Sequence, residues 1–344
     1  MNPRMSQLRA LFDAGAYFKL VCGAGNADAR EVERLAAIYT LAGANGFDVA
    51  AVPSVVEACG VGINRAYGLA SGLGVAIPVR PFITVSVGVP GDHHVRKALI
   101  TDACVACGKC IPACPTEAIP ANLVVIRDRC IGCGACEAAC PPRIAAIAYE
   151  HDEKGLRDTL PRCLAAGAEN IELHAAVPDD DAILDEWRVV AEVQPDHFIS
   201  MCLDRQHLSN TQLMGRIRQA HAVAGQRLII QADGVPMSGG RDDANTTLQA
   251  IATADIIRKQ LIDVDRAFKH LPVLLSGGTN SHTGALARAC GVPFAGVAIG
   301  THARKVVKPA LEVADLWSQP ALLAAAVDAA RDLVSASLGL PQPA

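Results

Sequence analysis

Hydrophobic and polar residues follow two patterns that alternate along the chain. Short runs rich in Val, Ile, Leu and Phe are typical of buried strands, whereas longer stretches with apolar residues three and four apart are typical of helices. Strands are predicted at 18–22, 47–52, 82–87, 170–174, 197–203, 227–231, 272–276 and 296–299. Helices are predicted at 30–41, 54–64, 155–166, 181–192, 211–224, 245–260, 282–290 and 320–338. Such alternation indicates parallel βαβ units.

Eight strand–helix units are the number that closes a TIM-type (β/α)8 barrel, which typically takes about 250 residues. The chain has 344 residues, and we interpret the surplus as an insertion after the third strand. We therefore expect a first barrel part at 1–90, the insertion at 91–150 and a second barrel part at 151–340. An open doubly wound sheet is the alternative, but Asp28 stands where its glycine fingerprint needs the third glycine.

The charge and composition exclude two classes of partner. Lys and Arg number 31 and Asp and Glu number 35, and only 4% of residues are aromatic. This balance predicts no nucleic-acid partner, and the lack of a long apolar run predicts no membrane insertion. Because Arg4, Arg9 and Asp13 interrupt the apolar residues near the amino terminus, we expect no signal peptide and a cytoplasmic protein.

Eight cysteines in the insertion follow the pattern C-x2-C-x2-C-x3-C-P twice, once from Cys104 to Pro115 and once from Cys130 to Pro141. With this spacing, three cysteines of one copy hold an iron–sulfur cluster and the fourth belongs to the other cluster. We predict one [4Fe-4S] cluster on Cys104, Cys107, Cys110 and Cys140 and a second on Cys130, Cys133, Cys136 and Cys114. Residues 100–150 resemble bacterial two-cluster ferredoxins. Zinc is less suitable, because one site uses four ligands and leaves the repeat unexplained.

Polar residues stand at the predicted carboxyl ends of the barrel strands, where barrel enzymes keep their active sites. They are Asn26, Glu172, His174, Asp204, Gln231, Asp233 and Asn280. Candidate catalytic residues are Cys22, Glu172, His174 and Asp233, although a buried thiol with only a packing role is the more common case for a lone cysteine. Lys19 is expected to be a buried cation paired with Asp48 or Glu172.

Two glycine loops follow the seventh and eighth strands. Gly277, Gly278, Gly300 and Thr301, with Arg304, predict an anion site for FMN or another phosphate-bearing small molecule, since backbone amides can approach a phosphate there. Tight turns without a ligand are the alternative. The loop 231–241 is expected to contact a ligand or to serve as a connector, and His93 and His94 are expected in a solvated entry loop.

The whole chain resembles the light-dependent period family of iron–sulfur proteins, over residues 10–308. The resemblance rests on four segments besides the double cysteine motif: Phe18–Ala24, Tyr39–Ala44, Phe47–Ala51 and Leu275–Asn280. It implies a redox-responsive protein that conveys electron-transport status to a partner. A weaker resemblance, to flavin barrels such as dihydroorotate and dihydropyrimidine dehydrogenases, rests on Asp233–Gly239, Asn245–Thr247 and the two glycine loops.

Two functions therefore remain. One is redox sensing or electron transfer with a redox partner protein or electron donor, and with a small-molecule ligand in the barrel mouth. The alternative is an FMN-dependent oxidoreductase that receives electrons from the two clusters, so whether the protein is an enzyme stays open. Because the insertion replaces a βα loop, and all βα loops emerge at the carboxyl face, we also predict that the clusters lie over the barrel mouth.

Overall fold

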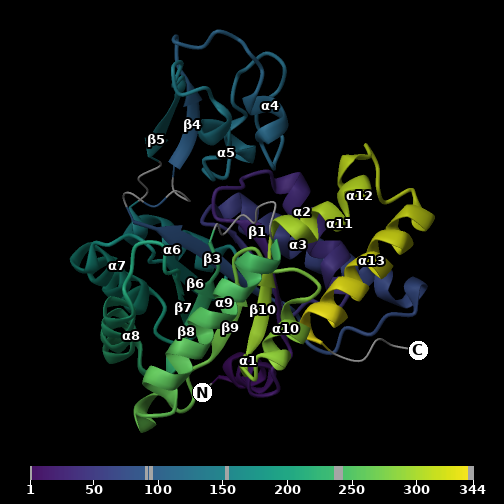
Figure 1. The fold of residues 1–344 in the computed structure, drawn as a ribbon. Helices are drawn as coiled ribbons and strands as arrows, with labels where there is room; N and C mark the ends of the chain where they lie inside the picture. Colours follow the sequence, from purple (N-terminus) through teal and green to yellow (C-terminus); the bar gives the residue numbers. More distant parts are fainter. Residues whose placement is uncertain (1, 90–91, 93–95, 152–154, 236–242, 340–344) are drawn as a thin grey trace.

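A computed structural model describes residues 2–89, 92, 96–151, 155–235 and 243–339. Eight parallel strands close into a barrel in the order β1-β10-β9-β8-β7-β6-β3-β2, which confirms the predicted (β/α)8 fold (Figure 1). The strands are β1 (Tyr17–Gly23), β2 (Gly46–Ala50), β3 (Phe82–Gly88), β6 (Asn170–His174), β7 (Ile199–Leu203), β8 (Leu228–Asp233), β9 (Val273–Ser276) and β10 (Gly296–Ile299). The predicted loop histidines His93 and His94, and positions 236–241 of the loop after β8, lie outside the described residues.

The predicted helices are present and surround the barrel. They are α2 (Ala29–Leu41), α3 (Pro53–Ala70), α6 (Leu156–Ala165), α7 (Asp180–Val193), α8 (Asn210–Ala224), α9 (Asp243–Ile257), α10 (Thr283–Ala289) and α13 (Pro320–Leu338). Local signals fix their starts: Asp28 and Asp179 cap α2 and α7, and Ser209 begins α8 with a capping box. Two short helices, α11 (Thr301–Val306) and α12 (Lys308–Glu312), lie between β10 and α13.

One helix that the hydrophobic pattern did not predict closes the amino end of the barrel. Helix α1 (Pro3–Asp13) buries Met5, Leu8 and Phe12 in a cluster with aromatic residues at the starts of the strands, such as Phe82. It lies at the end of the barrel opposite the inserted segment (Figure 1). Apolar packing therefore closes the amino end of the barrel.

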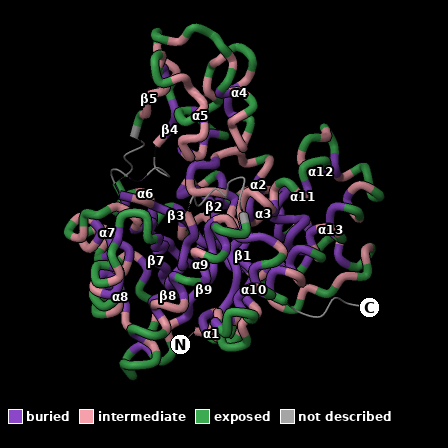
Figure 2. The backbone as a smooth tube through the Cα atoms, viewed as in Figure 1, coloured by how far each residue is buried: buried purple, intermediate pink, exposed green. Residues whose placement is uncertain are grey.

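The insertion, residues 96–151, forms a small separate unit that we call the cassette. Strands β4 (Arg96–Ile100) and β5 (Ile147–His151) pair antiparallel, and each cysteine motif contains a short helix, α4 (Cys110–Ala113) or α5 (Ala135–Ala139). The cassette projects from the carboxyl end of the barrel, as predicted from its place after β3 (Figure 1). Its tip is more exposed than the barrel (Figure 2).

The main hydrophobic core lies between the barrel strands and the surrounding helices, where the backbone is mostly buried (Figure 2). Trp187 is fully buried there, and its indole N–H donates to the carbonyl of Ala220. Within the described residues no helix has both the length and the apolar character needed to cross a membrane.

Candidate functional site

The interior of the barrel carries charged side chains at positions where TIM barrels usually place branched apolar residues. Lys19 Nζ lies 2.6 Å from Glu172 Oε2 and 3.4 Å from Asp48 Oδ2, and all three side chains are almost fully buried. Burial lowers the pKa of Lys19, but the two carboxylates outweigh it and raise the pKa overall. Burial raises the pKa of Asp48 to about 7, whereas Lys19 holds the pKa of Glu172 below its usual value despite burial. The expected Lys19 pairing is thus confirmed with both carboxylates.

A second set of buried polar groups lies one step closer to the mouth, on neighbouring strands β6, β7 and β8. The Cys202 thiol donates to Asp233 Oδ2 at 3.1 Å, and Gln231 Nε2 donates to Glu172 Oε1 at 3.1 Å. Burial raises the pKa of Asp233 to about 7. Burial, together with the negative charge of Asp233, raises the pKa of the Cys202 thiol. These two sets of side chains together make up the polar network of the barrel interior.

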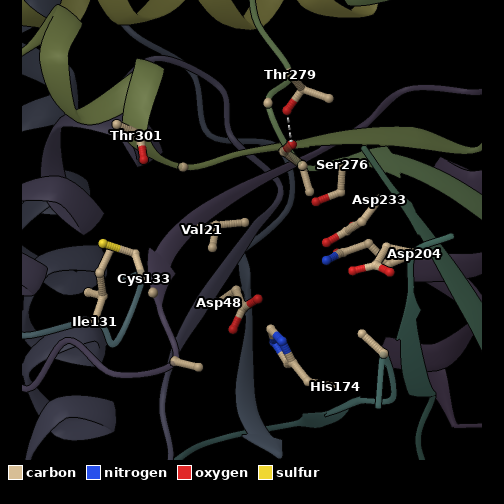
Figure 3. Close-up of a pocket in the computed structure, with 18 of the residues that line it drawn as sticks. Val21, Asp48, Ile131, Cys133, His174, Asp204, Asp233, Ser276, Thr279 and Thr301 are labelled. Carbon is tan, nitrogen blue, oxygen red and sulfur yellow. Dashed lines mark hydrogen bonds between the residues drawn. The ribbon is translucent and has the colours of Figure 1, made fainter. Parts of the chain in front are cut away.

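Above this network lies a cavity of about 700 Å³ whose walls come from both parts of the molecule. Asp48, His174 and Asp233 line it from the barrel strands, and Ile131 and Cys133 line it from the cassette (Figure 3). The cassette thus covers the barrel mouth, as its insertion point predicts. A group bound in this cavity would contact the barrel side chains and the second cysteine motif together.

The structure brings most of the predicted mouth residues together. Cys22, His174 and Asp233 line the cavity, whereas Glu172 lies in the network below it. Burial raises the pKa of the Cys22 thiol, so this residue is a poor source of thiolate. Asn26 is not among the residues that line the cavity, and its amide donates to the Cys22 carbonyl and to Glu31.

The glycine loops also line the cavity, but packing accounts for two of their glycines. Gly277 and Gly278 have φ of +69° and +67°, and a Cβ at Gly278 would lie 2.1 Å from the Thr246 side chain. A Cβ at Gly277 would lie 2.7 Å from the carbonyl oxygen of Gly234. These contacts require glycine whether or not an anion binds.

The three remaining anion-site candidates, Gly300, Thr301 and Arg304, differ in their contacts. Arg304 donates to Glu31 Oε1 at 2.8 Å and to the Cys22 carbonyl at 2.7 Å, so its guanidinium holds α2 and β1 in place. Gly300 and Thr301 border the cavity, and so does the exposed Lys305, which was not among the predicted anion-site residues. Arg304 and Lys305 both line the cavity beside Gly300 and Thr301, so both cations would face a phosphate group at this rim.

In the cassette, the cysteine thiols influence one another's pKa values within two groups of four. The pKa of Cys110 is raised by burial and by the nearby Cys104, Cys107 and Cys140. The pKa values of Cys133 and Cys136 are raised by burial and by a different set, Cys114 and Cys130. Each group thus contains three cysteines of one motif and the last cysteine of the other.

The backbone around these thiols suits iron–sulfur clusters. Amide N–H groups donate to four of the sulfurs at 3.2–3.4 Å, two in each group: Ala106 to Cys104, Ala146 to Cys140, Ala118 to Cys114 and Ala98 to Cys130. A small cavity is lined by all four thiols of the second group, Cys114, Cys130, Cys133 and Cys136. Such N–H to sulfur bonds tune cluster potentials. The donor set therefore fits two clusters.

The cassette is fixed to the barrel mouth by contacts that the sequence did not predict. Lys97, almost fully buried, donates from Nζ to the carbonyls of Gly25 and Cys130. The Ala27 N–H donates to the Asp128 carbonyl at 2.6 Å. Glycine is required at position 25, because a Cβ there would lie 2.9 Å from Ile131 Cα. The second motif therefore rests directly on the β1–α2 loop.

Comparison with known proteins agrees with this architecture. The model of the light dependent period A C-terminal domain matches residues 163–336, and the 4Fe-4S binding domain matches twice, at 98–119 and 123–144. A curated relative, "Light dependent period A" of Synechococcus elongatus, is 34% identical over 336 residues, covering 93% of this chain and 91% of the relative. The chain belongs to the light dependent period A family. Its cassette contains two 4Fe-4S motifs, so the protein is an iron–sulfur member of that family.

Among solved structures, the chain is similar to barrel proteins of low sequence identity. The YdjI aldolase from Escherichia coli K12 gives a TM-score of 0.46 at 8% identity, covering 94% of this chain and 92% of that one. A truncated 3-deoxy-D-arabino-heptulosonate 7-phosphate synthase from Thermotoga maritima gives a TM-score of 0.43 at 13% identity, covering 90% and 84%.

Proposed function

We propose that the protein is a redox sensor or electron-transfer protein in which the state of the cassette and the binding of a small molecule in the barrel mouth influence each other. The observation that carries this proposal is the shared cavity, which Cys133 lines from the cassette and His174 and Asp233 line from the barrel. A charge change in the cassette acts across a partly desolvated space, where it is screened less than in bulk water.

The eight cassette thiols are the proposed ligands. Cys104, Cys107, Cys110 and Cys140 would hold one [4Fe-4S] cluster, and Cys130, Cys133, Cys136 and Cys114 the other. The grouping of their mutual effects on pKa supports this crossed arrangement. The chemistry that such clusters supply is the transfer of single electrons at potentials set by their surroundings.

The two thiol groups have different surroundings, which suggests different roles. Cys107 of the first group is exposed, and the neighbouring Val105 is 64% exposed. Cys133 of the second group faces the cavity, and Ile131 beside it packs on the barrel loop at Gly23 and Gly25. We therefore assign the first group to contact with a redox partner protein, and the second to coupling with the barrel. A cytoplasmic location remains part of this proposal.

The ligand assignment is tested on the anaerobically reconstituted protein. Wild type should contain about eight irons per chain. In Cys114→Ser, the paramagnetic signal of the cluster on Cys130, Cys133 and Cys136 should change, and in Cys140→Ser that of the other cluster. A wild-type content of about four irons or fewer, or the reverse pattern in the two variants, would contradict the crossed arrangement.

The same sample decides the flavin alternative. Protein denatured under anaerobic conditions should release no stoichiometric flavin, because packing explains Gly277 and Gly278 without a phosphate. One FMN per chain, lost in Lys305→Glu and retained in the exposed control Lys259→Glu, would instead establish the oxidoreductase.

A further inference from the structure

Three buried donor atoms of different chemical kinds meet where the cavity joins the barrel interior. One donor atom each from Glu172, His174 and Cys202 lies within 4.8 Å of the other two. Glu172 and His174 are two residues apart on β6, and His174 is the register partner of Cys202 on β7. Their side chains therefore point to the same side of the sheet, into the barrel. Rigid strands hold all three donors in place.

The two carboxylate oxygens of Glu172 and the two ring nitrogens of His174 lie in different surroundings. Glu172 uses Oε2 for Lys19 and for the hydroxyl of Ser200, each at 2.6 Å. Its Oε1 accepts the amide N–H of Gln231 and lies 3.8 Å from His174 Nε2. The other ring nitrogen, Nδ1, lies 3.9 Å from Asp92 Oδ2. Each ring nitrogen of His174 therefore lies beside a carboxylate, and Nε2 is the nitrogen that faces Glu172.

A separate observation indicates a missing occupant. Gln231 is 3% exposed and lines the cavity, yet its Oε1 has no hydrogen-bond partner among the described residues. Its Nε2 is bound to Glu172, which directs the amide toward the three donors. Buried carbonyl oxygens are almost always paired, and a water molecule bound to an ion would satisfy this one.

The surrounding charge favours a cation. Among the residues that the structure describes, five buried carboxylates lie around these three donors and the barrel interior, where Lys19 is the buried lysine: Asp48, Asp92, Glu172, Asp204 and Asp233. A thiol donor is unsuited to magnesium or calcium, which take oxygen ligands. Imidazole, thiolate and carboxylate together suit zinc, and three protein ligands leave a fourth position for water or substrate.

We propose that Glu172, His174 and Cys202 bind one Zn²⁺ ion at the floor of the cavity, separate from the cassette. Binding forms a zinc–sulfur bond and releases the Cys202 proton, which Asp233 accepts in a hydrogen bond in the present structure. No electron is transferred. The open fourth position faces the cavity, so a ligand entering there would meet the metal below and the second cysteine motif above.

The test measures zinc and iron together on the full-length, anaerobically reconstituted protein after addition of zinc sulfate and removal of excess metal. Wild type should retain about one zinc per chain besides its iron. Cys202→Ser and His174→Gln should each lower zinc affinity about 100-fold or more, with iron content unchanged. Cys22→Ser, which removes a buried thiol lining the same cavity but outside the cluster, should retain the zinc.

X-ray absorption at the zinc edge supplies an independent readout. The proposed site gives one sulfur at about 2.3 Å with nitrogen and oxygen at about 2.0–2.1 Å. The proposal would be overturned if wild type retained no zinc, or if both Cys202→Ser and His174→Gln retained it. A zinc shell of sulfur alone would also overturn it, because the zinc would then be bound by the cassette. If the Cys202→Ser variant does not fold, the zinc content of the His174→Gln variant tests the proposal. The iron content tests the cassette separately, so either proposal can fail alone.

Discussion

The cassette and the barrel differ in how much apolar packing surrounds their cysteine and charged side chains. Three of the six buried residues in the cassette core are cysteines, Cys110, Cys130 and Cys136, and the others are two alanines and one isoleucine. The barrel has an extensive aliphatic core, and Lys19 is paired within it with Asp48 and Glu172. We therefore expect the cassette, with so small a core, to depend on bound metal for folding, and the barrel to depend mainly on apolar packing. The redox region is thus the less stable region, attached to a rigid support.

The strongest test of this contrast is to remove one buried cassette ligand. Cys130→Ser should lower iron from about eight to about four per chain and open the cassette, since metal binding and folding are coupled there. Limited proteolysis should cut first within residues 96–151, while thermal unfolding of the barrel stays unchanged. Cys290→Ser, an exposed cysteine outside the cassette, is the matched control. Unfolding of the whole chain as one unit would contradict the contrast.

The next largest effect is expected in the barrel floor. Lys19→Met leaves Asp48 and Glu172 without their counter-charge and should lower the free energy of unfolding by about 3–5 kcal/mol. Denaturant unfolding measures this change, with iron content unaffected and the exposed Lys259→Met as control. Adding Glu172→Gln should recover part of the loss. A change below about 1 kcal/mol would show that the pair is not charged in the folded protein.

The two regions also differ in how far the sequence predicts them. The proposed cluster ligands within one motif are three residues apart, so local spacing predicts them. The number of barrel strands and helices can be predicted equally well, because strands and helices have different hydrophobic periods. No local pattern marked Cys202 as a metal-ligand candidate. Glu172 and His174, the other two proposed ligands, lie about 30 residues away in the sequence and come close to Cys202 through strand register. Helix α1 was missed because Arg4 and Arg9 interrupt its apolar residues.

A smaller effect is expected at the contact between the two regions. Lys97→Met removes a buried ammonium that binds the carbonyls of Gly25 and Cys130. Hydrogen bonds to charged groups contribute about 1.5–3 kcal/mol, and local opening should become easier by that amount. Hydrogen exchange at the Ala27 amide, which donates to Asp128, should accelerate accordingly. Lys109→Met, on the exposed surface of the cassette, should leave exchange there unchanged.

The smallest effect tests whether the regions communicate at all. Burial raises the pKa of Asp233 to about 7, so its carboxylate is ionised at pH 8.5. A negative charge on the far side of the cavity opposes the arrival of an electron in the cassette. Asp233→Asn should therefore raise the midpoint potential, by about 10–40 mV for an interaction of up to about 1 kcal/mol.

A matched variant separates this effect from a general change in net charge. Asp328→Asn on α13 removes a charge whose side chain is 69% exposed, where solvent screens it. Redox titration of zinc-free protein at pH 8.5 should show a shift for Asp233→Asn and none for Asp328→Asn. Equal shifts in both variants would mean that only the overall field matters. No shift in either would mean that the cavity, although lined from both sides, does not transmit charge to the cassette.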